Sequence, residues 1–258
     1  MKNYLLPCFV LFLLFTACSK TEIETAEAGE NIFYELRIYD AAPGKLDDLH
    51  ARFRDHTMDL FEKHGMENIG YWEPIENLES QLYYVLAYPN RDAREASWEA
   101  FLSDPVWIQA KGESETDGGL VAGVQSVFLT ATDYSPPIAP SVSENPRIFE
   151  FRTYKASDGN LGRLHSRFRD HTIDLFTKHG IEHFGYWSPV DAGKGADDTL
   201  IYFITHRNAE ARDASFNTFR SDPAWVTARD DSEARAGGSL TMSVDPVMMR
   251  ATDYSPAK

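Results

Sequence analysis

The segments RFRDHTMDLFEKHG, residues 52–65, and RFRDHTIDLFTKHG, residues 167–180, are nearly identical and decide how the chain is organised. Outward from them, residues 34–72 align with residues 149–187 without a gap and are identical at 24 of 39 positions. Both aligned regions end in Gly-Tyr-Trp, and the later sequences SDPVW and ATDYSP return in the second half as SDPAW and ATDYSP. A repeat of this length indicates an internal duplication, so the chain holds two copies of one folding unit.

Each copy is predicted to contain the same order of strands and helices. Residues 32–39 alternate between two kinds of side chain, which is typical of a strand with two different faces. Asp104 and Pro105 are suited to begin a late helical piece as its N-cap and first-turn proline. The predicted order in the first copy is a strand over 32–39, a helix over 43–64, strands over 69–72 and 82–88, a helix over 91–102, the late helical piece and a strand over 124–130. This β-α-β-β-α-β order is ferredoxin-like.

Two ferredoxin-like units in one chain predict an α+β fold in which each unit covers the open sheet face of the other. One unit has helices on one face of its sheet only, so the other face needs a cover. We therefore expect the two sheets to pack face to face as a pseudo-dimeric α+β barrel. The predicted domains are residues 32–136 and 147–258, joined by a Pro- and Ser-containing linker over 137–146. This packing would bury two polar rows inside the barrel: Glu35, Arg37 and Tyr39, and Glu150, Arg152 and Tyr154.

The N-terminus has the features of a lipoprotein signal. Lys2 precedes an apolar run that is too short to span a bilayer comfortably, and Phe15-Thr16-Ala17-Cys18 resembles a lipobox. We expect residues 1–17 to be removed as a signal peptide, Cys18 to carry the lipid and residues 18–31 to form a polar tether. The predicted protein is exported and lipid-anchored in a bacterial cell envelope, facing the periplasm or the cell surface. An ordinary signal peptide followed by a chance cysteine is the alternative.

The acidic composition restricts the possible partners. A net charge of -15 argues against binding to nucleic acid and against adsorption to anionic membrane surfaces. The membrane is therefore expected as a partner only through the lipid on Cys18. A small-molecule ligand, and assembly beyond the internal pseudo-dimer, stay open.

Several motifs give the chain a family resemblance. Tyr34-Glu35-Leu36-Arg37, Pro43-Gly44-Lys45, Lys63-His64-Gly65 and Gly70-Tyr71-Trp72 follow one another in an order that resembles a NIPSNAP domain. The second copy matches more loosely, with Asp158-Gly159-Asn160 where the family pattern has Pro-Gly-Lys. The resemblance implies a dimeric α+β barrel, a superfamily that includes cofactor-free oxygenases, small isomerases and haem-binding proteins. It implies no settled set of catalytic residues.

The two polar rows supply the candidate ligand-binding residues. An arginine inside a closed barrel needs an anion, because burying an unpaired charge is costly. Glu35 and Glu150 could supply it in a structural network that holds the two sheets in register. The alternative is a pocket for an anionic or aromatic molecule, whereas Trp107 and Trp225 are interpreted as packing anchors. The residues assigned to the pocket, or otherwise to the core, are Arg37, Tyr39, Tyr71, Trp72, Arg152, Tyr154, Tyr186 and Trp187.

The histidines recur in pairs but do not predict a metal site. His50 and His64 are about 21 Å apart along one predicted helix, and neither the HExxH pattern nor a cysteine pair suited to a metal is present. His56 and His171 lie at the edge of the apolar stripe, each beside an aspartate. These two are the candidate catalytic bases, with hydrogen-bonded boundary residues as the alternative.

Two classes of function fit these residues. The first is a non-catalytic envelope lipoprotein that binds a small molecule or serves as a scaffold. The second is a dimeric-barrel enzyme, a cofactor-free oxygenase or an isomerase, acting on a small aromatic or anionic substrate. It would use His56 or His171 as base, with an arginine holding an oxyanion. No cofactor is required, although a neutral histidine could hold haem. Whether the two copies hold one site or two stays open.

Overall fold

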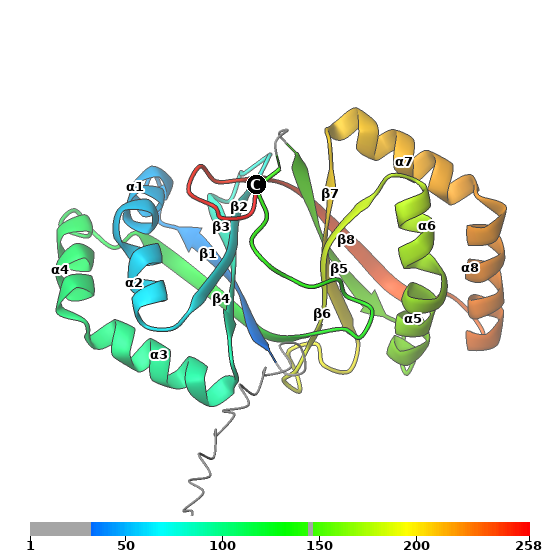
Figure 1. The fold of residues 1–258 in the computed structure, drawn as a ribbon, viewed down its shortest axis with the longest axis horizontal. Coiled ribbons are helices and arrows are strands. Elements are labelled where there is room, and N and C mark those ends of the chain that lie inside the picture. The colour runs from blue at the N-terminus through cyan, green and yellow to red at the C-terminus, as the bar shows by residue number, and fades with distance from the viewer. Residues whose placement is uncertain (1–31, 144–146) are drawn as a thin grey trace, which may run out of the picture. The chain divides into compact units, whose positions relative to one another are not determined.

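The computed structural model describes residues 32–143 and 147–258, which contain both repeats (Figure 1). The predicted signal peptide, the lipidation residue Cys18 and the tether lie outside the described residues, as do positions 144–146 of the predicted linker. Within the two described ranges, no helix is long and apolar enough to cross a membrane.

Both repeats contain the predicted order of elements. The first repeat has β1 (Phe33–Ala41), α1 (Leu46–Arg52), the π-helical turn η1 (Phe53–Thr57), α2 (Met58–Lys63), β2 (Glu67–Pro74), β3 (Gln81–Tyr88), α3 (Arg91–Ser103), α4 (Pro105–Ser114) and β4 (Val121–Ala131). The second repeat has β5 (Ile148–Ala156), α5 (Leu161–Arg167), η2 (Phe168–Thr172), α6 (Ile173–Lys178), β6 (Glu182–Pro189), β7 (Thr199–His206), α7 (Ala209–Ser221), α8 (Pro223–Ala236) and β8 (Thr241–Ala251). Each copy is therefore a ferredoxin-like unit.

The eight strands form one closed barrel in the order β1-β3-β2-β8-β5-β7-β6-β4. Within each repeat the first strand pairs antiparallel with both the third and the fourth. The repeats join where β2 meets β8 and where β4 meets β6, with Trp72 opposite Ala251 and Ala131 opposite Trp187. The helices cover the outside of the barrel (Figure 1). The predicted pseudo-dimeric α+β barrel is confirmed, and its two sheets also join edge to edge.

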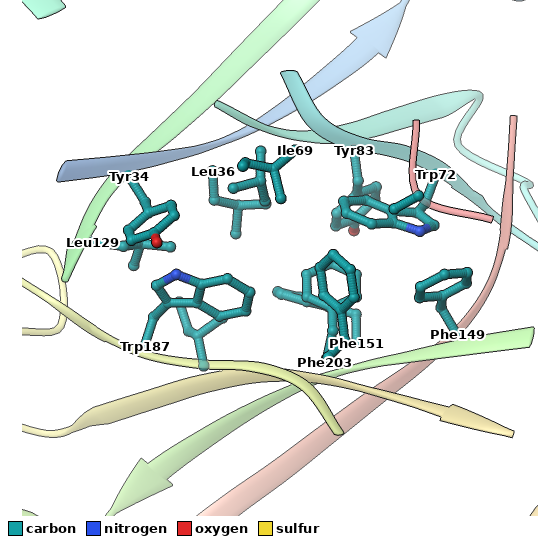
Figure 2. Packing of buried hydrophobic residues seen from close by; sticks show 14 of the residues in the cluster. Tyr34, Leu36, Ile69, Trp72, Tyr83, Leu129, Phe149, Phe151, Trp187 and Phe203 are labelled. Carbon is teal, nitrogen blue, oxygen red and sulfur yellow. The ribbon is translucent and has the colours of Figure 1, made fainter. Parts of the chain in front are cut away.

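The interior of the barrel is apolar, which corrects one prediction. The side chains that meet there come from both repeats (Figure 2) and include Tyr34, Leu36, Trp72, Phe149, Phe151, Trp187 and Phe203. The alternation of β1 and β5 was predicted correctly, but the two faces are exchanged. The polar rows that begin at Glu35 and Glu150 face the helices, because α3 and α7 supply arginine partners there. Among the described residues, the cluster inside the barrel consists of aromatic and aliphatic side chains and contains no arginine.

The long helix of each repeat contains a π-helical turn. A single helix was predicted over 43–64, whereas the structure has a helix that begins at Leu46 and in which η1 separates α1 from α2. Thr57 Oγ1 donates a hydrogen bond to the backbone oxygen of Arg52 at 3.0 Å, and the second repeat has the equivalent bond at 3.1 Å. The wider turn lets Arg52, Phe53 and Thr57 all be buried.

Each copy of ATDYSP crosses to the opposite repeat. Tyr254 packs into the core beneath the helices of the first repeat, and its hydroxyl lies 2.7 Å from His50 Nδ1. Arg54 donates two hydrogen bonds to Asp253, at 2.7 and 2.8 Å. Residues 131–136 make the equivalent contacts with the second repeat through Asp133, Tyr134 and Ser135. Residues 131–136 and 251–256 are the crossing segments, and each completes a core beneath the other repeat's helices.

Candidate functional site

A cavity of about 800 Å³ lies between the sheet and the helices of the first repeat. Side chains from β1 and β4 line it on one side, and side chains from α1, η1, α3 and α4 line it on the other. This volume is within the range usual for small-molecule sites, about 300–1,000 Å³. Aromatic rings and charged groups are mixed in the lining, which includes Arg37, Tyr39, Arg52, Phe53, Arg94, Trp98, Phe101, Trp107, Lys111 and Glu115.

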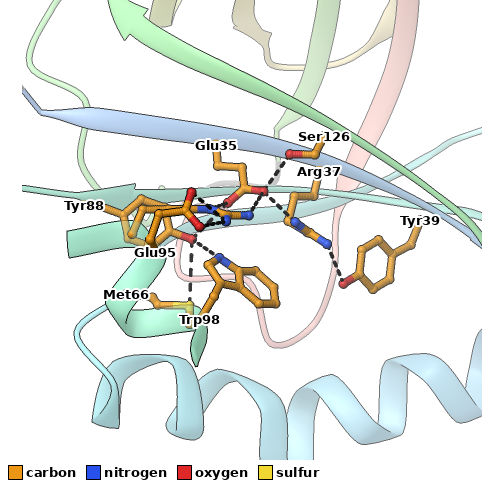
Figure 3. Close-up of polar contacts among 9 residues, drawn as sticks. Glu35, Arg37, Tyr39, Met66, Tyr88, Glu95, Trp98 and Ser126 are labelled. Atoms are coloured by element: carbon orange, nitrogen blue, oxygen red, sulfur yellow. Dashed lines mark hydrogen bonds and ion pairs between the residues drawn. The ribbon is translucent and has the colours of Figure 1, made fainter. Parts of the chain in front are cut away.

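A buried carboxylate organises the sheet side of this cavity. Glu35 is fully buried and accepts two hydrogen bonds of 2.9 Å from Arg94 on α3. It also accepts hydrogen bonds from Arg37 Nη1 at 2.5 Å and from Ser126 Oγ at 2.6 Å (Figure 3). Burial acts to raise the pKa of Glu35, but Arg94, Arg37 and Ser126 together hold it below its ordinary value. The network therefore ties the sheet to α3 within one repeat. The prediction that it joins the two sheets was wrong.

Arg37 presents a cation to the cavity. Its guanidinium lies 4.4 Å from the centroid of the Trp98 ring, and its Nη2 lies 3.3 Å from the Tyr39 hydroxyl. The buried Nε of Arg37 has no hydrogen-bond partner in the described part of the chain. Arg37 and Arg94 share Glu35, while the other carboxylate bound to Arg94, Glu95, is exposed. The buried part of the network thus has excess positive charge and can accept an anionic ligand group.

A second buried cation lies on the helix side of the cavity. Arg52 Nη1 donates to Glu115 Oε1 at 2.7 Å, and the guanidinium lies 5.2 Å from the centroid of the Trp107 ring. Lys111 binds the same carboxylate. Trp98 and Trp107 are thus each contacted by an arginine, and these cation–π pairs form walls suited to a flat, anionic molecule.

The equivalent cavity of the second repeat is nearly filled. Its volume is about 220 Å³, below the usual range for small-molecule sites. The position of Leu102 is taken by Arg220, whose guanidinium lies 5.3 Å from the centroid of the Phe216 ring. Arg152 and Arg212 lie over the same ring at 5.1 and 4.9 Å. Arg37 and Arg94 lie over the Trp98 ring of the first repeat in the same way. Arg220 is therefore the added arginine of the small cavity, and Leu102 takes its place at the large one.

The structure brings half of the predicted ligand residues to the two cavities. Arg37 and Tyr39 line the large cavity, and Arg152 and Tyr154 line the small one. The other four predicted residues are fully buried and line neither cavity. Two of them pack beneath the helices and two inside the barrel: Tyr71 and Tyr186, and Trp72 and Trp187, respectively.

Sequence reasoning missed the tryptophans that wall the large cavity. Trp107 was interpreted as a packing anchor, and Trp98 was not singled out. A signal for Trp107 was available, because Asp104 caps α4 by accepting a hydrogen bond from the Val106 backbone N–H at 2.8 Å. That cap fixes where α4 begins, and Trp107 lies in its first turn.

The candidate catalytic histidines lie away from Arg37. His56 and His171 are both exposed, and each borders a groove on the outside of the helices that is separate from the large cavity. His64 Nε2 lies 2.7 Å from Asp104 Oδ2, and the second repeat has the equivalent pair. In the described residues no group of three or more His, Cys, Asp or Glu side chains could hold a metal ion.

The comparisons with known proteins agree with the repeat and the fold. A sequence model of the NIPSNAP family matches residues 34–136 and 149–256. Among solved structures, an anthrone oxidase-like protein is 11% identical, with a TM-score of 0.55 over 89% of this chain and 95% of its own. An uncharacterized NIPSNAP-like domain protein from Burkholderia xenovorans is 21% identical, with a TM-score of 0.39 over 45% of this chain and 98% of its own. None of the curated proteins compared with the chain matches it.

Proposed function

This chain belongs to the NIPSNAP family, and on that premise we propose that it is a non-catalytic small-molecule-binding protein whose ligand occupies the large cavity of the first repeat. The observation that carries the proposal is the difference between the repeats. The two repeats have the same order of strands and helices, but the cavity between sheet and helices is about 800 Å³ in the first repeat and about 220 Å³ in the second. Packing of the core does not require an opening in one copy only. One ligand per chain is therefore expected.

The lining favours a flat, mostly apolar ligand with one anionic group. Trp98 and Trp107 supply aromatic surface for stacking. Arg37 and Arg52 are buried or half-buried, and each keeps a buried Nε without a partner in the described residues. A carboxylate or sulfonate placed between them would receive charge-assisted hydrogen bonds. The acidic rim residues Glu95 and Glu99 disfavour ligands with several negative charges.

Oxidation of an aromatic substrate is the second candidate function. Its support is the similarity to an anthrone oxidase-like protein, which covers most of both chains but shows only a shared fold. The predicted bases His56 and His171 do not line the cavity, and no histidine is among the described residues that do. For the same reason the lining does not fit a haem held by an axial histidine. Binding without catalysis fits these residues better.

The same proposal includes attachment to the bacterial cell envelope. The lipobox-like sequence that ends at Cys18 supports a lipid anchor, and the polar residues that follow would act as a tether. The net charge of -15 supports an acidic body that stays in solvent and meets the membrane only through the lipid.

Replacing Leu102 by arginine is expected to close the large cavity. Leu102 is 55% exposed, so the change should leave the free energy of unfolding within about 0.5 kcal/mol. The new guanidinium can lie over Trp98 as Arg220 lies over Phe216. Fluorescence titration with the aromatic anion 8-anilinonaphthalene-1-sulfonate should show one site in the unchanged protein and at least about tenfold weaker binding in L102R, a loss of about 1.4 kcal/mol.

Two further variants make this experiment decisive. Ile108→Arg makes the same kind of change at a residue that is 58% exposed and does not line the cavity, so its binding should be unchanged. Arg220→Leu should enlarge the small cavity and add a second site. Equal binding by L102R and I108R would rule out the large cavity as the site. Native mass spectrometry of protein from its own host would then test for a retained ligand, and an empty protein would favour a scaffold.

Replacing Cys18 by alanine is expected to abolish lipid attachment. The thiol of Cys18 is the only group in the lipobox-like sequence that can carry the lipid. Growth with radiolabelled palmitate should label the unchanged protein and leave C18A unlabelled, with C18A recovered in the soluble fraction. Cys8→Ala is the control and should keep the label. Label that persists in C18A would contradict the anchor.

A further inference from the structure

A groove on the outside of the second repeat has an unusual concentration of positive charge. It has a volume of about 210 Å³ and lies between α5 and α8. Arg163 and Arg235 are exposed at its edges, and Arg167, which is 6% exposed, lies at its base. Ser166 and Ser232 add hydroxyl groups to the lining, and Asp170 and His171 border it. The three arginines of this small groove contrast with the net charge of -15 of the whole chain.

The first repeat has an equivalent groove of about 410 Å³ whose lining carries more acidic than basic side chains. There Asp48 takes the place of Arg163, and Asp117 takes the place of Arg235. Only the buried arginine is kept, as Arg52. The rest of the framework is equivalent, since both grooves lie between the first and last helices of a repeat. Packing requirements common to both copies therefore cannot account for the two edge arginines.

Helix electrostatics do not account for Arg163 either. It lies in the first turn of α5, where a cation is disfavoured by the helix dipole. The first turn of α1 instead carries Asp47 and Asp48, which the dipole favours. Among the described residues, neither Arg163 nor Arg235 has a carboxylate within ion-pair distance. Arg163 Nη1 donates a hydrogen bond of 3.3 Å to the neutral side chain of Asn160, which does not balance its charge.

The buried arginine at the base of the groove is incompletely neutralised. Arg167 Nη1 lies 3.4 Å from Glu233 Oε1, compared with 2.7 Å for the equivalent Arg52 and Glu115. Its Nε is buried without a partner in the described part of the protein. Burial lowers the pKa of Arg167, and Glu233 acts in the opposite direction. An external anion would supply the missing charge.

We propose that this groove binds a tetrahedral oxyanion, either free phosphate or the phosphate of a small phosphomonoester. Arg163, Arg167 and Arg235 would donate charge-assisted hydrogen bonds to its oxygens. The hydroxyls of Ser166 and Ser232 donate to the backbone oxygens of Gly162 and Arg229, so the arginines are the donors that the anion would use. The groove is too small for a larger organic ligand, so the phosphate group itself is the part recognised. This site is separate from the large cavity of the first repeat and does not depend on what that cavity binds.

Isothermal titration calorimetry with inorganic phosphate, and separately with glycerol 3-phosphate, tests the proposal on the full-length protein at fixed ionic strength. One saturable site per chain is expected, and the tighter of the two compounds identifies whether free phosphate or a monoester is preferred. The double variant R163D/R235D places at these two positions the aspartates that the first repeat has there, and it should bind at least tenfold more weakly. R163Q/R235Q should show a loss in the same direction without adding negative charge.

The control is K194D/R207D, which changes the net charge by the same amount at exposed residues that do not line the groove. Its phosphate affinity should stay within twofold of the unchanged protein. Three results would each overturn the proposal: no saturable binding by the unchanged protein, full binding by R163D/R235D, or equal losses in both Asp double variants. Melting temperatures of all variants establish that the comparison is between folded proteins.

Discussion

Replacing Glu35 by glutamine is expected to destabilise the protein by about 3–5 kcal/mol, because the change leaves two arginines without their shared counter-charge. Glu35 is fully buried and receives hydrogen bonds from both Arg94 and Arg37. Glutamine keeps the shape of the side chain, but its amide nitrogen cannot accept the hydrogen bonds that one of the two carboxylate oxygens receives. The loss would therefore report charge and hydrogen bonding and not packing. Urea denaturation followed by circular dichroism measures the free energy of unfolding directly.

Glu99 provides the matched control for this experiment. It lies on α3, is exposed, and has no side-chain ion pair among the described residues. Glu99→Gln should therefore change the free energy of unfolding by no more than about 0.5 kcal/mol. If Glu35→Gln cost no more than its control, the glutamate would not be the anion that compensates Arg37 and Arg94. Glu150→Gln should behave like Glu35→Gln, since Glu150 receives the same bonds from Arg212 in the second repeat.

Replacing Trp72 by alanine is expected to cost about 3–5 kcal/mol through the cavity that it leaves in the barrel. The Trp72 ring lies 4.6 Å from the centroid of Phe203 and 5.4 Å from that of Phe149, so its contacts join the two repeats. The indole also covers Gly70, where an added Cβ would overlap the ring. Differential scanning calorimetry should show one transition at a lower temperature, since both repeats lose the same core.

Leu78→Ala is the control for the barrel variant. Leu78 is 91% exposed, and its truncation should change the free energy of unfolding by less than about 0.5 kcal/mol. Two separate transitions in Trp72→Ala, or a cost close to that of the control, would contradict a single interior shared by both repeats.

The sequence was sufficient to predict the duplication, the element order and the closed barrel, but not which face of β1 lies inside. A period of two residues separates Glu35 and Arg37 from Tyr34 and Leu36 and is the same whichever pair is interior. The deciding partner of Glu35 is Arg94, which lies on α3, 59 residues later in the chain. The sequence did contain a signal for this partner. Arg94 and Arg212 each follow a helix-capping asparagine by four residues, so the two arginines occupy equivalent positions in the two repeats.

The site was predicted in part for the same reason. Arg37 and Tyr39 were identified because they share a polar strand face, which the sequence shows directly. The open cavity depends instead on Leu102 in one repeat and Arg220 in the other. A difference between two exposed positions is unremarkable in sequence. The difference between Leu102 and Arg220 can be interpreted only from the structure, where the two side chains border equivalent cavities.

The crossing segments also affect how the protein is made. The hydroxyl of Tyr254 reaches His50 from 204 residues later in the chain, and the hydroxyl of Ser255 receives the Tyr71 backbone N–H from 184 residues later. A nascent chain that has just finished its first repeat therefore lacks the last ring of that repeat's core. The core of the first repeat is complete only after residues 251–256 have been translated. A ribosome that stalls inside the second repeat would therefore leave the first repeat without the contacts of Tyr254 and Ser255.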